Sequence, residues 1–528
     1  MRREWAGRLK PGGWRAAGGW ALLSLFLTFL GAGPVEADAV RPRVELDRQA
    51  VLVGEKRPVF VLVDFEVAQA PQRAAQARPR VNLALVLDRS GSMAAQGKME
   101  YAKKAAKFVV DRLEPTDRLA VVEYDDRITL LWPSSPVESP RMIKRLIDGL
   151  QPRGSTNLTG GMMQGVEQVR AHLGADRINR VILLSDGLAN TGVTHPLQIA
   201  GLVRAARAGG VTLSTMGLGL QYNEDLMQAI AQDGGGRYYY IESPTQLVRI
   251  FEREMSTLFA TVAKAVRVGF SGGEAVEKVE VFGYPAEIAG RNAVVPMENF
   301  YSGEKRVLLL RLTVKAGKEG EIPLGRIDLS YLDTTDNRPK TVSAELKVTA
   351  SSSPQVVTAS LNKGVVAEAA LVEADQRHEE YVKLYQQGKR QEAKAGLDGL
   401  AKALAARNAG LSDVRLGKKV EALRLEAEEM DKAAASAQAR SAYAKAAKQR
   451  LYLSQKGQRG MYILKEGDTG YEVERLQAAL KTEGLYKGPV DGKFGPEVAA
   501  AVREFQQRSQ LAVDGVAGPR TMQALKLY

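Results

Sequence analysis

One carboxylate and two hydroxyls alternate in the segment Asp88-Arg-Ser90-Gly-Ser92. They follow a nearly continuous apolar run over residues 81–87, which indicates a strand buried on both faces that closes in a Gly-containing turn. Ligands of open α/β sheets collect at the carboxyl ends of the strands. Oxygen donors without cysteine or histidine suit a hard divalent cation such as Mg²⁺ or Mn²⁺. The segment therefore predicts a cation site, with an ordinary helix N-cap as the simpler alternative.

Two further loops carry the same kinds of oxygen donor. Thr156 stands directly before an expected helix, and Asp186 follows a short apolar strand. Strands and helices alternate through this part of the chain, which predicts a doubly wound, mostly parallel α/β sheet. In such a sheet the strands end at one shared edge, so the three loops are expected to meet. We expect strands at 81–88, 118–124, 181–185, 211–218 and 237–240, and helices at 99–113, 158–173 and 223–233.

These three segments, in this order, closely resemble the von Willebrand factor A (VWA) domain and its metal-ion-dependent adhesion site. The resemblance implies one bound Mg²⁺ or Mn²⁺, held by hydroxyls that ligate directly and by aspartates that act largely through water. It also implies an open coordination position, which an Asp or Glu carboxylate of a protein partner fills. A weakly charged ligand shell leaves Mg²⁺ electrophilic, in agreement with such a role. The matching residues are Asp88, Ser90, Ser92, Thr156 and Asp186.

Residues 262–350 alternate apolar and polar side chains in segments separated by turns, which is typical of a β-sandwich. Residues 40–70 carry similar strand signals, so the VWA-like segment is expected to be an insertion in a β-domain. A linker rich in Pro, Ala and Arg is expected at 69–80. Bacterial exported proteins related to the calcium-activated chloride channel regulators resemble this arrangement. The protease activity of the eukaryotic regulators depends on a zinc motif that is absent here, so that activity is not implied.

Residues 363–455 are rich in Ala, Glu, Lys and Arg, with apolar residues at helical spacing. An interruption around Gly388 indicates a helical hairpin of tetratricopeptide-like character. The second helix ends in a basic, Ala-rich section that contains Lys445 and Lys448. We interpret this section as a solvated spacer helix, with a dedicated anion-binding face as the alternative.

The C-terminal part contains an internal repeat, in which Val490-Asp-Gly-Lys-Phe-Gly-Pro496 recurs as Val513-Asp-Gly-Val-Ala-Gly-Pro519. Asp-Gly suits a tight turn and Gly-Pro suits a helix start, so the repeated residues are expected to be structural. The repeats and the opening L-x-x-G-x-x-G-x-x-V-x-x-L-Q closely resemble the peptidoglycan-binding domain that accompanies many cell-wall hydrolases. The resemblance implies a three-helix core and peptidoglycan as a ligand. The opening residues are Leu464, Gly467, Gly470, Val473, Leu476 and Gln477.

Residues 1–37 combine a basic start, an apolar stretch at 20–30 and small residues before Asp38, which is typical of a secretory signal. The apolar stretch is shorter than the ~20 residues of a membrane span. The alternative is an uncleaved anchor, which would attach the chain to a membrane. The expected location is the periplasm or cell surface. The net charge of +13 favours anionic surroundings, and no segment resembles a nucleic-acid-binding module, so no nucleic-acid partner is expected.

The chain contains no cysteine and only three dispersed histidines. This excludes thiol catalysis, disulfides and Cys-type zinc sites, on which many wall-modifying enzymes with such a binding domain depend. The composition does not exclude a glycosidase, which would use a pair of carboxylates. We therefore expect no enzyme but an exported adhesion or interaction protein, which captures an acidic partner and binds the cell wall. An envelope scaffold or regulator is the alternative.

The expected fold class is multidomain: a doubly wound, Rossmann-like VWA sheet inserted in a β-sandwich, a helical hairpin spacer and a small three-helix domain. The expected domains are a signal peptide at 1–37, N-terminal sandwich strands at 38–75, a VWA domain at 78–260, a β-sandwich at 261–350, a helical spacer at 351–460 and a peptidoglycan-binding domain at 461–528.

Overall fold

The structure is a computed structural model, and it describes residues 39–68, 78–434, 436–455, 464–468, 471–511 and 513–525. The expected signal peptide lies outside the described residues, as do positions 69–77 of the expected linker. The remaining linker residues lead directly into a strand that begins at Arg80. Within the described ranges, no helix has both the length and the apolar character that a membrane span requires.

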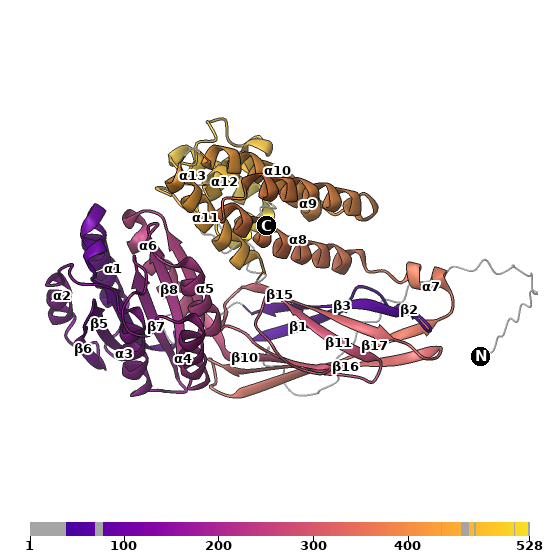
Figure 1. Ribbon diagram of the computed structural model, residues 1–528, viewed down its shortest axis with the longest axis horizontal. Helices are drawn as coiled ribbons and strands as arrows, with labels where there is room; N and C mark the ends of the chain where they lie inside the picture. Colours follow the sequence, from indigo (N-terminus) through magenta and orange to yellow (C-terminus); the bar gives the residue numbers. More distant parts are fainter. Residues whose placement is uncertain are drawn as a thin grey trace, which may run out of the picture. The chain divides into compact units, whose positions relative to one another are not determined.

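A six-stranded sheet forms the core of the segment between residues 80 and 259 (Figure 1). Its strand order is β6-β5-β4-β7-β8-β9, and each neighbouring pair is parallel except β5 and β6. The prediction of a doubly wound, mostly parallel sheet is therefore confirmed. The strands are β4 (Arg80–Asp88), β5 (Arg118–Tyr124), β6 (Ile128–Pro136), β7 (Arg177–Ser185), β8 (Thr212–Leu218) and β9 (Gly235–Ile241).

Helices cover both faces of this sheet, which explains why its central strands are almost continuously apolar. In β4, Leu83, Leu85 and Leu87 pack against one helical layer. Ala84 and Val86 pack against the other. The first layer contains α1 (Lys98–Arg112), α2 (Pro140–Asp148) and α6 (Leu247–Phe259). The second contains α3 (Leu158–Arg170), α4 (Pro196–Ala208) and α5 (Glu224–Asp233).

Two further sheets enclose a separate hydrophobic core and form a β-sandwich. Their strand orders are β1-β3-β15-β11 and β12-β13-β10-β16-β17-β2, and β14 pairs with β10. Strands β1 to β3 precede the six-stranded sheet in the chain and the others follow it, so the predicted insertion is confirmed. The strands are β1 (Val40–Leu46), β2 (Ala50–Leu52), β3 (Lys56–Val67), β10 (Thr261–Gly272), β11 (Val276–Phe282), β12 (Glu287–Ala289), β13 (Asn292–Pro296), β14 (Phe300–Tyr301), β15 (Lys305–Lys315), β16 (Gly320–Asp333) and β17 (Pro339–Ser351).

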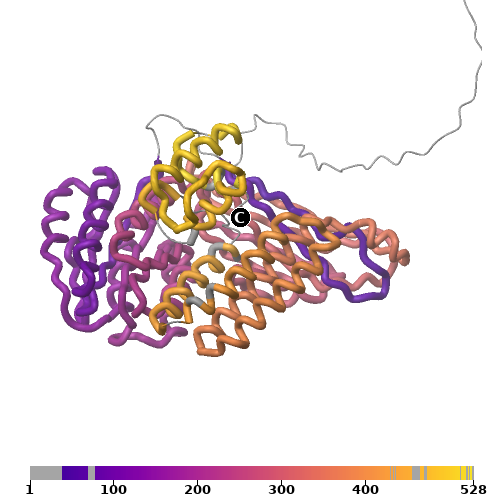
Figure 2. Tube along the Cα trace, turned by 90° about the horizontal axis from the view of Figure 1, so that it is seen from above, coloured from indigo at the N-terminus to yellow at the C-terminus, as the bar shows by residue number. Residues whose placement is uncertain are grey.

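The region after the sandwich differs from the expected hairpin, because residues 363–455 form four long helices. The expected break at Gly388 separates the first two, and two more breaks follow. Helices α8, α9 and α10 lie side by side (Figure 2), and α8 also packs on apolar side chains of β3, β11 and β15. The helices are α7 (Pro354–Ala359), α8 (Lys363–Gln386), α9 (Arg390–Leu411), α10 (Val414–Ala433) and α11 (Ala437–Gln455).

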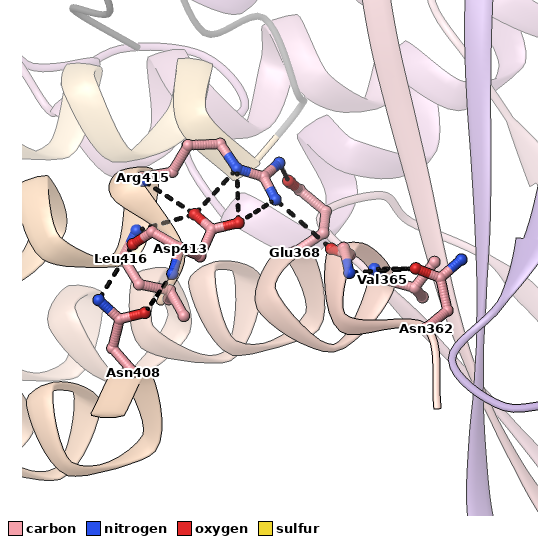
Figure 3. Close-up of polar contacts among 8 residues, drawn as sticks. Asn362, Val365, Glu368, Asn408, Asp413, Arg415 and Leu416 are labelled. Atoms are coloured by element: carbon pink, nitrogen blue, oxygen red, sulfur yellow. Dashed lines mark hydrogen bonds and ion pairs between the residues drawn. The ribbon is translucent and has the colours of Figure 1, made fainter. Parts of the chain in front are cut away.

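Polar side chains stabilise the unexpected break between α9 and α10 (Figure 3). The Asn408 amide accepts the N–H of Asp413 at 2.8 Å and donates to its carbonyl oxygen at 3.0 Å. The Asp413 carboxylate accepts the N–H of Arg415 at 2.8 Å and so caps the start of α10. The Arg415 guanidinium then joins Asp413 to Glu368 on α8, at 2.8 Å from each. These contacts fix three helices around one turn.

The C-terminal module contains three helices around its own small core, as expected. A buried glutamine supports each copy of the Asp-Gly repeat. Gln477 accepts the N–H groups of Asp491 and Gly492 at 3.0 and 2.9 Å. Gln506 accepts those of Asp514 and Gly515 at 3.1 and 2.9 Å. The helices are α12 (Tyr471–Thr482), α13 (Pro496–Arg508) and α14 (Pro519–Ala524).

Helix α3 approaches the six-stranded sheet so closely that a β-carbon at Gly165 would lie 2.5 Å from Val86 Cγ2. We expect Gly165→Ala to lower the free energy of unfolding by about 1–3 kcal/mol through overpacking. Gly201 is exposed within α4 and has nothing within 4 Å of its β-carbon position, so Gly201→Ala should raise stability by about 0.5–1 kcal/mol. Urea denaturation of both variants measures the free energy of unfolding. A change of the same sign in both variants would contradict the close packing of α3 on the sheet.

Candidate metal centre

The carboxyl end of β4 holds the first predicted site residue in a fixed orientation. Asp88 is the last residue of the strand and is fully buried. Its Oδ1 accepts the backbone N–H of Ser90 at 2.8 Å, and its Oδ2 accepts the hydroxyl of Ser185 at 2.7 Å. Ser185 ends the neighbouring strand β7, so two adjacent strand ends hold this carboxylate.

The two predicted hydroxyls connect this strand end to the third predicted loop. Ser90 Oγ and Ser92 Oγ lie 3.0 Å apart. Ser92 Oγ donates to Asp186 Oδ1 at 2.6 Å. The other oxygen of Asp186 accepts from Lys98 Nζ, also at 2.6 Å, and both side chains are buried. The structure therefore brings Asp88, Ser90, Ser92 and Asp186 together.

Thr156 reaches the same place from the loop before α3. Its backbone N–H donates to Asn190 Oδ1 at 2.8 Å, which fixes this loop to the one after β7. A β-carbon on Gly187 would lie 3.1 Å from Thr156 Oγ1 and 3.6 Å from Ser92 Oγ, so the two hydroxyls face the same small space. No hydrogen bond of Thr156 Oγ1 is found within the described part of the chain. All five predicted residues thus meet at one edge of the sheet.

The donor set fits a hard divalent cation. Its oxygens come from hydroxyls and carboxylates, and one hydroxyl has no other described partner. Burial raises the pKa of Asp88 to about 6, and the nearby Asp186 carboxylate adds to this shift. A cation would offset the repulsion between the two carboxylates. Over the described residues, no group of three or more His, Asp or Glu side chains forms a possible metal site. A cation at this edge would therefore depend on the hydroxyls.

Three residues that support the candidate centre are not among the five predicted ligands. Lys98 supplies positive charge to Asp186, Ser185 orients Asp88, and Asn190 holds the Thr156 loop. Lys98 is the first residue of α1 and gives only the signal of an ordinary surface lysine. Ser185 directly precedes Asp186 and Asn190 follows it by four residues, so nearness in sequence to a predicted ligand is the only signal available.

Helix α11 borders a hollow of about 620 Å³ at this edge. Ser92, Thr156 and Gly187 line it from the sheet, and Ser441 and Lys445 line it from α11. The hollow thus joins the candidate ligands to a helix that lies more than 200 residues further along the chain.

The interpretation of the basic section of α11 as a solvated spacer is wrong. Lys445 and Lys448 are only 2% and 3% exposed, because they meet the acidic first turn of α5. Lys445 Nζ donates to Glu224 and, at 2.9 Å, to the carbonyl oxygen of Tyr222. Lys448 Nζ lies 2.5 Å from Asp225 Oδ1. Burial favours the neutral form of Glu224, but hydrogen bonding and charge from Lys445 outweigh it and lower the pKa of Glu224 to about 2.

Residues 82–253 match the family described as von Willebrand factor type A domain. The chain contains a VWA domain. Residues 469–525 match a second family, described as putative peptidoglycan binding domain, so the chain also contains this domain. The six-stranded sheet and the candidate metal centre both belong to the VWA segment.

Two relatives match about half of the chain. It is 32% identical over 239 residues to the uncharacterized protein YfbK of Escherichia coli, over 42% of this chain and 41% of that protein. It is 28% identical over 279 residues to the uncharacterized protein sll0103 of Synechocystis, over 51% of this chain and 66% of that protein. The match spans less than two thirds of either relative.

A solved structure, von Willebrand factor type A from Catenulispora acidiphila, shares the fold with a TM-score of 0.62 at 17% identity. The likeness covers 80% of this chain and 99% of that one. The common fold therefore extends well beyond the VWA domain itself.

The buried ion pair between Lys98 and Asp186 makes a direct prediction about the VWA domain. Lys98→Met should lower the free energy of unfolding in EDTA by about 3–5 kcal/mol, because it leaves a buried carboxylate without its ammonium. The matched control is Lys104→Met on the same helix, where the side chain is exposed and the expected change is within about 0.5 kcal/mol. Urea denaturation measures both, and similar losses in the two variants would contradict the role assigned to Lys98.

Proposed function

We propose that this chain is an exported cell-envelope binding protein. Its VWA domain captures an acidic protein partner through a divalent cation, and its C-terminal domain binds peptidoglycan. The convergence of five oxygen-bearing side chains from three loops at one sheet edge carries the proposal. Domains of these two kinds are typically non-catalytic, which supports a binding role rather than an enzymatic one.

In this proposal Mg²⁺ or Mn²⁺ is held by the hydroxyls of Ser90, Ser92 and Thr156. Asp88 and Asp186 orient the hydroxyls and add negative charge, largely through water. The hollow beside these residues has room for an Asp or Glu side chain of the partner. A carboxylate is the natural further ligand because hard cations prefer charged oxygen donors.

The signal-like sequence at residues 1–37 supports export, and the wall-binding domain supports a place in the periplasm or on the cell surface. The protein is attached to a membrane only if the signal sequence is not cleaved. Peptidoglycan and a protein ligand are the partners that this location offers.

An envelope scaffold or regulator is the second candidate. The contacts of α11 with α5 favour it, since they connect the helical region to the face that carries the candidate metal centre. A partner that is recovered only with Mg²⁺ supports capture through the metal. A partner that stays bound in EDTA and depends on α8 to α11 supports the scaffold instead.

Mg²⁺ should stabilise the protein, and Thr156→Val should weaken this effect. The substitution removes an oxygen that has no described hydrogen bond, so unfolding in EDTA should change little. We expect the Mg²⁺ affinity, obtained from the melting temperature as a function of Mg²⁺ concentration, to fall about tenfold. Thr129→Val, on the exposed side of β6, is the matched control. An unchanged response of Thr156→Val to Mg²⁺ would remove Thr156 from the centre.

Sedimentation with purified peptidoglycan sacculi tests whether the C-terminal domain, and not the VWA domain, binds the cell wall. We expect the full chain to pellet equally with Mg²⁺ and with EDTA, and a chain that ends at Gln455 to stay in solution. Pelleting that follows Mg²⁺ and survives this truncation would mean that the VWA domain binds the wall. Absence of pelleting under all conditions would contradict the peptidoglycan anchor.

A further inference from the structure

A cavity of about 660 Å³ lies at the other end of the VWA sheet, where β7, β8 and β9 begin. Its lining includes the first residues of β7 and β8, Arg177 and Thr212, together with Lys264 and Arg267 from β10 of the sandwich. The proposed metal centre lies at the opposite edge of this sheet, at the carboxyl ends of β4 and β7, and does not use this cavity. Its volume is typical of sites for small molecules.

Positive charge dominates the lining. Among the described residues, Arg204 is the only cation of the lining that donates a hydrogen bond to a carboxylate. Its partner is Asp233, at 3.0 Å. Glu287 is the other acidic residue of the lining. The cationic residues are Arg177, Arg204, Arg207, Lys264 and Arg267. Asp176 lies just outside the lining and pairs with Arg177 at 3.8 Å. Five cations against three carboxylates leave an excess of two positive charges around one cavity.

Neutral carbonyl oxygens, and not carboxylates, satisfy the most enclosed cations. Lys264 Nζ donates to the carbonyl oxygens of Ala175 and, at 3.0 Å, of Arg177. Arg207 Nη2 donates to the carbonyl oxygen of Met297 at 2.6 Å. Burial lowers the pKa of both Lys264 and Arg207, because nearby acidic groups do not fully offset the loss of hydration. Both cations would gain from an additional anion.

Two further guanidinium groups have unused hydrogen-bonding capacity. Arg177 Nη1 is buried and has no hydrogen-bond partner. Arg267 is exposed, and no hydrogen bond or ion pair of its side chain is found among the described residues. Guanidinium groups bind phosphate and carboxylate oxygens in pairs of parallel hydrogen bonds. The cavity therefore offers donors of the type that oxyanions require.

A strained bulge in β10 brings the two sandwich cations to the same face. Lys264 pairs with Leu332 and Arg267 with Ser330. A step of three residues along β10 therefore corresponds to a step of two along β16, which leaves one extra residue in β10. Residues three apart in a regular strand face opposite sides, whereas this extra residue places Lys264 and Arg267 together. The bulge contains Ala265 in the left-handed region, with a φ of 52°, which costs on the order of 1 kcal/mol. Such strain is often found at binding sites.

We propose that this cavity binds a small polyanion, a molecule of about nucleotide size that carries phosphate groups or several carboxylates. The oxyanions contact Arg177, Arg207 and Arg267, and apolar lining residues such as Val266 and Met297 contact the uncharged part. Arg207 belongs to α4 of the VWA domain, whereas Arg267 belongs to the sandwich. The ligand therefore joins the two domains at their junction. This inference is independent of the proposed metal centre.

Isothermal titration calorimetry of the full chain at low ionic strength tests the proposal, with inorganic pyrophosphate and citrate as probes. The protein is first treated with EDTA and then freed of it by gel filtration. EDTA is itself a polycarboxylate that this cavity would bind, and a cation left at the candidate metal centre would recruit the anion. We expect saturable binding of at least one probe and a tenfold or larger loss of affinity in Arg267→Gln. Binding of pyrophosphate alone assigns the site to phosphates, and binding of citrate alone assigns it to carboxylates.

The control is Arg141→Gln, which removes the same charge from an exposed position at the start of α2. Its affinity for either probe should equal that of the unmodified chain. Equal losses in Arg267→Gln and Arg141→Gln would show that the anions respond only to net charge, which overturns the proposal. Absence of saturable binding of both probes overturns it as well.

Discussion

A carboxylate at the end of a strand that is buried on both faces is the constraint on which this structure depends. Removing a charged carboxylate from water costs several kcal/mol unless hydrogen bonds or opposite charges replace the lost hydration. Asp88 receives a backbone N–H from its own turn and a hydroxyl from the adjacent strand end. Asp186, the second buried carboxylate, needs Ser92 and Lys98. These requirements bring three loops and the start of α1 to one point, where a cation fits.

The parts of this structure that the sequence predicts are those with a local signal. The apolar run before Asp88 predicts β4 because every residue of a two-sided strand is buried, and Gly-Pro predicts the start of α13 through the backbone alone. Strand β6 has no such signal, since it lies at the edge of the sheet and alternates poorly between buried and exposed positions. The five ligand candidates were found because their order along the chain matches a known motif.

Long-range pairing explains what the sequence does not predict. Lys445 and Lys448 look like residues of a solvated helix, and they are buried because Glu224 and Asp225 lie opposite them in space. No periodicity links residues that are more than 200 positions apart. The same holds for Lys98 and Asp186, and for the cations that β7, α4 and β10 bring to one cavity. The break between α9 and α10 is intermediate, since its Asn and Asp caps are visible but their effect depends on Arg415 and Glu368.

The insertion of the VWA domain has a consequence for the order of folding. Strand β3 pairs with β15 across more than 200 intervening residues, and closing so long a loop is entropically costly and slow. The two ends of the insertion, however, lie close together within the inserted domain, since the Arg78 guanidinium lies 4.2 Å from the centre of the Phe259 ring. A VWA domain that folds first therefore closes most of this loop itself and shortens the chain separation that the pairing of β3 with β15 has to bridge. The inserted domain acts as an internal template for the domain that it interrupts.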